Sequence, residues 1–584
     1  MRSKSLLPAP SRASSVWQAR SALLLAGVAA GAASGALGGL AHAQQPAAAA
    51  PITAPAAMPL PASVSPAAAA TVDVRSFKIE GNTLFDSARL AAVLDAWRGQ
   101  RTFAELRLAA QAVQGIYSAA GYGAVVAYLP PQAVSDGVVN ITVVEGKVAK
   151  VTVRGNKRQS ADRLRAALPS LVEGATPRVR RVDSELQIAN ENPARQVGVL
   201  LGPGAQAGEV EATVQVEEQP VQRWTLALDN SGNDRTGQWR ISAGWQHADI
   251  TGRDDVLNLQ LQTSPTETSK VRVASMGYRL PLVPWLSALD VFAAYSNVDG
   301  GTQATAAGDL RFSGRGHIAG ARSIWYLPRA GEYDQRMTVG LEYRAYLNSC
   351  QVGGLGAGAC GPAGESVSVT PLTLEYAAQT GGPVAAGITV ALAHNLSLGG
   401  GNNSAASFAA VRAGARPGYT VLRAGGNLSL PVGLPSTWPF KADEDWTVAA
   451  RTAVQYSGDN LVPGEQFGLG GAASVRGYQE RELAGDTGVQ LALELVSPRI
   501  DAGEQGARTD LRLLAFVDTG QVSNQGSTAC LGTQTHCTLT SWGLGARLGW
   551  GAVQMRLFAA QALDDAATTR RKSWRSHVAL SATF

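Results

Sequence analysis

Two short segments of the sequence carry residues that could form a specific charged contact. The first is a glycine-rich stretch with one arginine, Val475-Arg476-Gly477-Tyr478. The second, in a segment with strand periodicity, is Phe516-x-Asp518-x-Gly520. The planar guanidinium of an arginine can pair with a carboxylate through two parallel hydrogen bonds. An Arg476–Asp518 pair is therefore one interpretation, and a solvated loop arginine with an ordinary turn aspartate is the other.

The sequence contains no arrangement of residues that is typical of an enzyme. It has six histidines, and one of them, His42, lies in the N-terminal export segment described below. Neither a Ser/His/Asp arrangement nor a metal-ligand spacing is evident, so the sequence predicts no enzyme, no metal and no cofactor. The glycines at 468 and 470 superficially suit a dinucleotide fingerprint, but no predicted helix follows them, and we reject this interpretation.

The four cysteines fall into two local pairs, Cys350 with Cys360 and Cys530 with Cys537. In an exported protein, such pairs are expected to form disulfides. Metal binding is the sharper alternative, but spacings of ten and seven residues match no common zinc pattern. The sequence therefore favours two local disulfides.

Residues 1–43 have the features of a secretory signal peptide. Four basic residues precede an uncharged run over 21–41, and the small-residue site Ala41-His42-Ala43 follows. An uncleaved membrane anchor is the alternative, which the Ala- and Gly-rich run disfavours. Without residues 1–43 the formal net charge falls from +5 to +1, which argues against nucleic acid as a partner. Residues 44–71 contain six prolines and no charge, as an extended linker would.

Residues 72–147 and 148–219 have the pattern of two copies of one small α+β domain. Each copy begins with a strand that ends at Gly-Asn, at Gly81 and Gly155, and continues helix, helix, strand, strand. In the first copy we expect Asp86 to cap the first helix, and Thr102 and Glu105 to form a capping box for the second. Two unrelated small domains are the alternative, but the recurring order favours an internal repeat.

From residue 220 to residue 584 the sequence has strand periodicity. Segments of about ten residues alternate apolar and polar side chains. Sixteen candidate strands begin near residues 223, 237, 254, 269, 286, 310, 335, 366, 384, 418, 444, 487, 510, 540, 552 and 574. Their length, the aromatic residues at their ends and the export signal favour a transmembrane β-barrel of 16 antiparallel strands over a soluble β-sandwich.

An even number of strands returns the end of the barrel to the side of the two small domains. The short turns 247–254, 281–286 and 328–334 then lie on that side, and the longer loops 348–365, 458–486 and 521–539 lie outside. All four cysteines fall in these outer loops. Asp518 alternates with apolar residues of its strand, so it should point into the lumen, where loop 458–486 could fold inward to meet it. A barrel of this size would leave an aqueous lumen.

This combination resembles the two-partner secretion outer-membrane transporters (TpsB type), the haemolysin and filamentous-haemagglutinin secretion family within the barrel-assembly insertase superfamily. Residues 475–478 match the superfamily's V-R-G-Y/F loop motif, and residues 516–520 match its F-x-D-x-G strand motif. The two repeats resemble polypeptide-transport-associated (POTRA) domains; Tyr117-x-x-x-Gly121-Tyr122 is similar to part of the first one. Residues 229–232 (Asp-Asn-Ser-Gly) resemble the start of the barrel.

The resemblance implies a pore in the bacterial outer membrane that translocates a dedicated secreted protein from the periplasm to the cell surface without ATP. Periplasmic POTRA domains would bind the partner's N-terminal secretion domain, and the barrel would contact outer-membrane lipid. Arg476 and Asp518 would hold the inward loop, with Tyr478 and Phe516 packed around them. A barrel-assembly insertase is the alternative function. Relatives often begin with a plug helix; here it is either absent or a short segment around 67–70.

Overall fold

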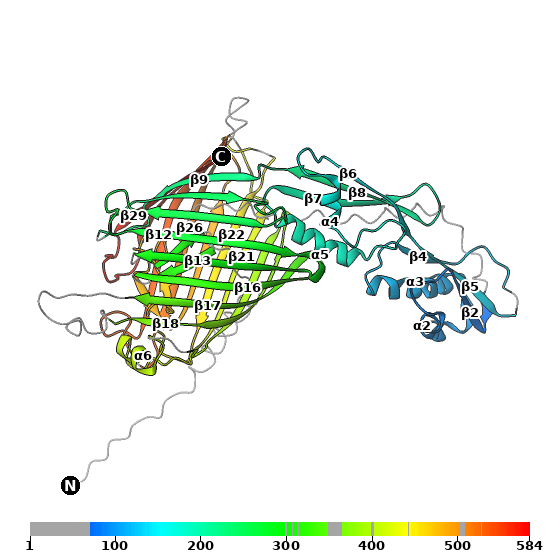
Figure 1. Cartoon of the computed structure of the whole chain (residues 1–584), viewed down its shortest axis with the longest axis horizontal. Coiled ribbons are helices and arrows are strands. Elements are labelled where there is room, and N and C mark those ends of the chain that lie inside the picture. Colours follow the sequence, from blue (N-terminus) through cyan, green and yellow to red (C-terminus); the bar gives the residue numbers. More distant parts are fainter. Residues whose placement is uncertain are drawn as a thin grey trace, which may run out of the picture.

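The computed structural model describes residues 71–584 except 135, 235, 298–300, 306–307, 313–314, 348–364, 399–401, 438, 442, 501–508 and 527. A barrel stands at one end and an arm of two small units extends from it (Figure 1). The predicted signal peptide, the possible plug segment and the Cys350–Cys360 pair lie outside the described residues.

The first arm unit is built around one long helix and a three-stranded sheet. Its elements are β1 (Thr71–Val74), β2 (Ser76–Glu80), α2 (Ser87–Ala92), η1 (Asp95–Trp97), β3 (Gly99–Thr102), α3 (Phe103–Ala119), β4 (Val125–Tyr128) and β5 (Val138–Glu145). Strand β5 lies between β2, to which it is parallel, and β4, to which it is antiparallel. The apolar face of α3 packs on this sheet through Ala110, Val113 and Tyr117.

Three local expectations for the first arm unit can be compared with the structure. The capping box of α3 is confirmed, with the Thr102 hydroxyl accepting from the Glu105 amide and the Glu105 carboxylate accepting from the Thr102 amide. Asp86 occupies the N-cap position of α2 as expected, but its side chain makes no capping hydrogen bond. The expected first strand is divided at residue 75, since β1 leaves the sheet to pair with β3.

The second arm unit repeats this topology. Its elements are β6 (Lys147–Arg154), α4 (Ala161–Ala166), α5 (Val179–Asn190), β7 (Arg195–Pro203) and β8 (Glu209–Glu218). Strand β8 lies between β6, to which it is parallel, and β7, to which it is antiparallel. The order and directions of the three strands are therefore the same in both units.

The Gly-Asn step after the first strand has the same physical cause in both units. Gly81 and Gly155 have φ of 86° and 87°, and a Cβ on either would lie 2.2 Å from a carbonyl oxygen of the neighbouring strand. Only glycine fits such a left-handed, closely approached position. After each glycine, a carboxylate accepts backbone amides: Glu145 in the first unit and Glu218 in the second. Burial disfavours the charge of both, but these hydrogen bonds outweigh it and lower the pKa of Glu145 and of Glu218.

The remainder of the chain forms a closed antiparallel barrel. Its strands are β9 (Gln222–Asp229), β10 (Arg240–His247), β11 (Val256–Thr263), β12 (Arg272–Leu282), β13 (Ser287–Asn297), β16 (Arg315–Ala330), β17 (Tyr333–Leu347), β18 (Val367–Val369), β19 (Pro371–Thr380), β20 (Ala385–Asn395), β21 (Thr420–Val432), β22 (Trp446–Tyr456), β25 (Thr487–Val496), β26 (Thr509–Ser523), β27 (His536–Trp550), β28 (Val553–Ala562) and β29 (Trp574–Thr583). Because β18 and β19 both pair with β17, they count as one interrupted strand, and the barrel has sixteen. Strand β29 pairs with β9 and closes it.

The sequence therefore predicted the fold class and the strand number correctly, with every start within five residues. Four short elements lie between barrel strands: η2 (Val283–Trp285), the hairpin β14 (Gly301–Thr305) and β15 (Gly308–Phe312), α6 (Ala405–Val411), and the hairpin β23 (Phe467–Leu469) and β24 (Leu483–Gly485). The predicted loop 521–539 is shorter than expected, because β26 and β27 extend to Ser523 and from His536.

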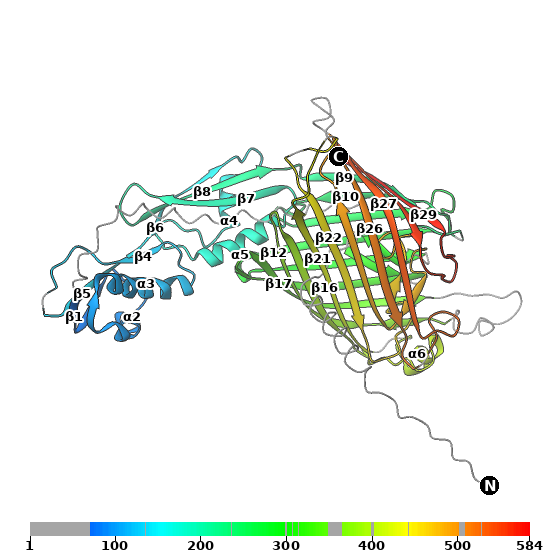
Figure 2. The same ribbon diagram turned by 180° about the vertical axis from the view of Figure 1, so that it is seen from behind.

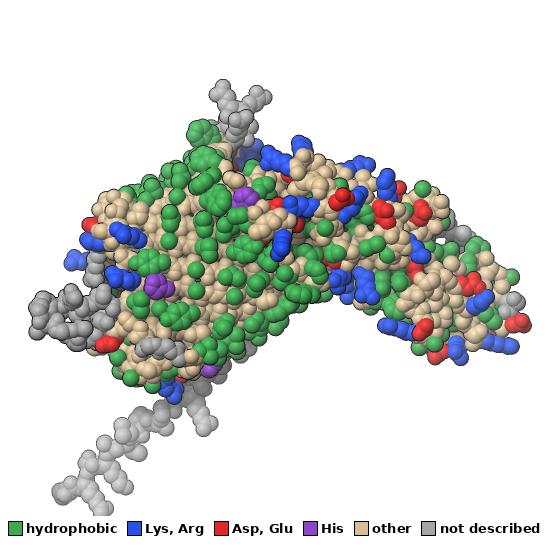
Figure 3. All heavy atoms as spheres, in the orientation of Figure 1, with side chains coloured by type: hydrophobic (Ala, Val, Ile, Leu, Met, Phe, Trp, Pro, Cys, Tyr) green, Lys and Arg blue, Asp and Glu red, His purple; other side chains and the backbone are tan. Residues whose placement is uncertain are grey.

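The outside of the barrel is apolar, whereas charged side chains gather on the arm (Figure 3). Exposed tryptophans lie at both ends of the wall, with Trp224 and Trp550 at the arm end and Trp542 and Trp574 at the far end. An apolar band between two aromatic girdles is the pattern of a barrel wall in lipid. In the described part of the chain, no helix combines the length and apolarity needed to cross a membrane.

The second arm unit is packed directly against the barrel rim (Figure 2). Helix α5 is buried from residue 182 to residue 190, because one face packs on the sheet of its own unit and Ile188 packs on Ile324 and Tyr326 of β16. Arg195 is buried and makes two hydrogen bonds of 2.9 and 2.8 Å to the carboxylate of Asp254.

The three turns predicted to lie on the arm side all contact the second arm unit. Arg163 pairs with Asp249, Arg181 donates to the carbonyl of Pro284, and Arg329 lies 3.4 Å from Asp183. The sidedness expected from the alternation of short and long connections is therefore confirmed.

A closed barrel makes a simple gel experiment informative. Every strand is paired on both edges, so the barrel should resist detergent until it is boiled. We expect the unboiled protein to migrate faster than the boiled protein in SDS gels, because it stays compact. Equal migration of the two samples would contradict the barrel.

Candidate functional site

The loop between β22 and β25, residues 457–486 and here called the inward loop, is the segment that carries the first motif. The side chains of Val475, Arg476 and Tyr478 are almost completely buried. The wall they meet includes β26, where Phe516 and Asp518 are buried and the alternating Ala515 and Val517 are exposed. The motif therefore lies against the lumenal face of the wall, as expected.

Arg476 and Asp518 form a bidentate pair. The Arg476 Nε and Nη2 donate to the two carboxylate oxygens of Asp518 over 2.7 and 2.6 Å, and the Arg476 amide donates over 3.0 Å. The third donor, Nη1, binds Glu494 of β25 over 2.7 Å. We call Arg476, Asp518 and Glu494 the tip clamp. No motif in the sequence links Glu494 to Arg476.

Two aromatic rings lie close to the guanidinium of Arg476. Its central carbon lies 3.4 Å from the ring centroid of Phe516 and 5.0 Å from that of Phe558 on β28. The two rings meet edge to face, with centroids 6.0 Å apart. A desolvated cation over an aromatic face is attracted by its quadrupole, so Phe516 both positions and stabilises the arginine.

The other motif residues have separate roles. Gly477 has φ of 95°, and its amide donates to Nε2 of His577 over 3.1 Å. The Tyr478 hydroxyl donates to the Thr540 carbonyl of β27 and accepts from the Asp564 amide in the connection between β28 and β29. A Cβ on Gly520 would lie 2.4 Å from the side chain of Leu469 in β23. Position 520, the glycine of the Phe516-x-Asp518-x-Gly520 motif, must therefore be small, because the inward loop packs on it.

The tip clamp is part of a larger charge cluster in the wall, in which Glu494 contacts three arginines. Glu494 also lies 3.5 Å from Arg451 and is bonded to Arg547. Removing one partner of a buried ion pair typically costs about 3–5 kcal/mol, because the other charge is left uncompensated. The described residues contain no group of His, Cys, Asp or Glu side chains that could hold a metal ion.

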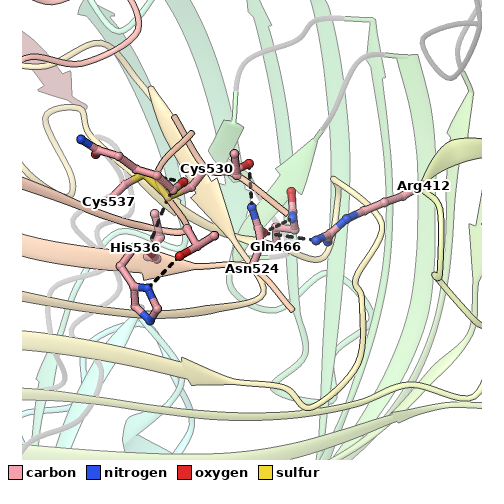
Figure 4. Close-up of a disulfide and its surroundings, with 10 residues drawn as sticks. Arg412, Gln466, Asn524, Cys530, His536 and Cys537 are labelled. Atoms are coloured by element: carbon pink, nitrogen blue, oxygen red, sulfur yellow. Dashed lines mark hydrogen bonds between the residues drawn. A yellow bond between two sulfur atoms is a disulfide. The ribbon is translucent and has the colours of Figure 1, made fainter. Parts of the chain in front are cut away.

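The two ends of the inward loop meet at a second buried carboxylate, Asp486. It pairs with Arg412, which follows α6, and accepts the amides of Leu461 and Gln525 over 2.9 and 2.8 Å. We call this contact the root. Figure 4 shows Arg412, Asn524 and Gln466 linked beside it. The predicted Cys530–Cys537 disulfide is present in the hairpin of β26 and β27, which also carries Asn524.

Family models match both parts of this architecture. The model described as haemolysin secretion/activation protein ShlB/FhaC/HecB matches residues 209–354 and 396–548, just over half of the chain. A ShlB-type POTRA model matches residues 72–146, the first arm unit. The chain belongs to the haemolysin secretion/activation family.

Individual members of the haemolysin secretion/activation family are distant in sequence. The chain is 25% identical over 178 residues to the heme/hemopexin transporter protein HuxB of Haemophilus influenzae, which is 30% of this chain and 31% of that protein. It is 24% identical over 442 residues to the outer membrane transporter CdiB of Escherichia coli, covering 72% and 68% of the two chains.

Solved structures of this family share the fold. The structure of CdiB from Escherichia coli covers 92% of this chain and 94% of its own, with a TM-score of 0.69 at 19% identity. That of CdiB from Acinetobacter baumannii covers 97% of both, with a TM-score of 0.65 at 15% identity. The predicted family is confirmed, because the chain matches the haemolysin secretion/activation model and carries a ShlB-type POTRA domain at residues 72–146. Members of the family are transporters rather than enzymes.

Proposed function

We propose that the protein is the outer-membrane pore through which one dedicated secreted protein passes from the periplasm to the cell surface, without ATP and without catalysing a chemical reaction. The observation that carries this proposal is the inward loop. Discrete polar contacts hold it against the lumenal face of a barrel at Arg476 and Tyr478, and Asp486 ties its two ends to outer connections. A lumen closed by a segment that is tied in at a few points can open without unfolding the wall.

Recognition of the partner belongs to the arm in this proposal. Each three-stranded sheet of the arm has two edge strands, among them β4, whose outward side chains Val126 and Tyr128 are exposed. An extended chain can add to such an edge through main-chain hydrogen bonds, which require few particular side chains. The partner's N-terminal secretion domain would bind here while the barrel wall remains in outer-membrane lipid.

Loss of the gene is the direct test. In the bacterium that encodes this chain, its deletion should remove one large protein from the medium and cell surface, and expression of the chain should restore it. The measurement is quantitative mass spectrometry of the exported proteins and of the outer membrane. An unchanged set of exported proteins would contradict the proposal, and a general fall in many outer-membrane barrels would support the insertase function instead.

A further inference from the structure

The inward loop contains a buried carboxylate that none of the motifs includes. Glu465, near the start of the loop, is 1% exposed. It accepts hydrogen bonds from Nη1 of Arg344 over 2.8 and 3.1 Å, from Nη2 of Arg423 over 3.2 Å and from the Tyr346 hydroxyl over 2.7 Å. A carboxylate with two arginines and a tyrosine is held by charge-assisted bonds, which are stronger than bonds between neutral groups.

These partners come from a part of the wall that the tip clamp does not touch. Arg344 and Tyr346 lie on β17, and Arg423 lies on β21. The tip clamp lies on β25 and β26, which follow β21 and β22 around the barrel. The inward loop is therefore tied to two separate parts of the wall.

The receiving side is organised without the loop. Arg344 also bonds to Glu342 over 3.0 and 2.6 Å, and Glu342 bonds to Arg322 over 3.0 and 2.6 Å. Arg423 bonds to the Gln455 side chain over 3.0 Å. Because wall residues already orient both arginines, Glu465 enters a prepared site rather than creating one.

We infer that Glu465 is a second positioning residue for gating, which holds the inward loop against β17 and β21 independently of the tip clamp. The pore is closed on one side by Arg476 and on the other by Glu465, while the root at Asp486 keeps both ends of the loop in place. Opening then requires two separate charge clusters to be broken. This inference rests on the proposed pore function.

The substitution Glu465→Gln tests the inference. Glutamine keeps the size of the side chain but removes the charge, and Arg476, Asp518 and Glu494 are left unaltered. We expect the open time of the purified full-length protein in planar lipid bilayers to rise about tenfold or more, because bonds to a charged group are replaced by bonds to a neutral one. Cells with this variant should also admit a large antibiotic that an intact outer membrane excludes.

Glu444→Gln is the matched control. Glu444 pairs with Arg499 and lies 3.3 Å from Arg512, but it lies outside the inward loop. The Glu444→Gln variant should have the same conductance as the wild-type protein. Wild-type conductance in Glu465→Gln, or an equal rise in both variants, would overturn the inference. If Glu465→Gln does not give the heat-modifiable band, Arg423→Gln is measured instead, with the same rise expected and a wild-type trace overturning the inference.

Conductance separates this inference from the proposed function, since no partner protein is needed to measure it. Suppose that Glu465→Gln raises the conductance but the exported proteins of the bacterium do not depend on the gene. This result would support the role of Glu465 in holding the inward loop and refute the proposed secretion function. Conversely, a secreted protein that depends on the gene, together with wild-type conductance of Glu465→Gln, would support the secretion function and overturn the inference about Glu465.

Discussion

Arg476→Ala should abolish secretion of the partner protein while the barrel still reaches the outer membrane. The substitution removes three side-chain hydrogen bonds to Asp518 and Glu494 and leaves the Asp518 carboxylate buried. Breaking a buried pair in this way costs about 3–5 kcal/mol, which is enough to release the inward loop from its position, so that the loop no longer arranges the lumen for passage of the partner. The amount of partner in the medium measures the effect, and the heat-modifiable band shows that the barrel is folded.

Asp518→Ala should have the same effect, and combining the two should add little, because the members of one pair are not independent. Arg512→Ala is the matched control: it lies on the same strand, but its partners are Asp510 and Glu444. Cells with Arg512→Ala should secrete the partner protein at the wild-type level. Normal export by both Arg476→Ala and Asp518→Ala would remove the tip clamp from the mechanism.

Deletion of residues 72–146 should leave a pore that conducts but no longer secretes. The first arm unit contacts the second through a few groups, such as the Arg178–Tyr122 hydrogen bond of 2.8 Å. The second unit, in contrast, packs Ile188 of α5 against the barrel rim, so removing it as well would expose the apolar side chains of Ala288, Ile324 and Tyr326 on the barrel. Secretion should fall below detection, while the conductance in planar bilayers and the heat-modifiable band persist.

The control for this deletion is a pair of surface substitutions that leave the first arm unit in place. Val126→Thr with Tyr128→Thr keeps β-forming side chains on the exposed face of β4. Because main-chain pairing needs few particular side chains, this variant should secrete at a reduced but measurable level. Full secretion by the deletion variant would refute recruitment by the first arm unit.

The barrel could be predicted from the sequence because its signal is local. A wall with lipid on one face imposes alternation on every strand, and each strand can be recognised alone, as at Leu257, Leu259 and Leu261. The Arg476–Asp518 pair needed one further step, the resemblance of two motifs to a known family. In both cases the information lies within a few neighbouring residues.

The features that sequence reasoning missed depend on where distant segments meet. Helix α6 has a short sequence of mostly small residues, and it is fixed because Phe408 and Val411 pack in a cluster with Tyr419 and Leu461. Strand β3 is a polar tetrapeptide with no strand pattern in its sequence, and it is a strand because it pairs with β1. Glu465 likewise gains its meaning from arginines on two other strands, which no local pattern in the inward loop could reveal.

The direct joins along the arm have a mechanical consequence. A single residue, Gly146, separates the last strand of the first arm unit from the first strand of the second, and α5 is buried against the barrel rim. An arm built in this way has no slack segment that could stretch under tension. A force applied to the first arm unit would therefore be transmitted through α5 to the barrel rim at β16.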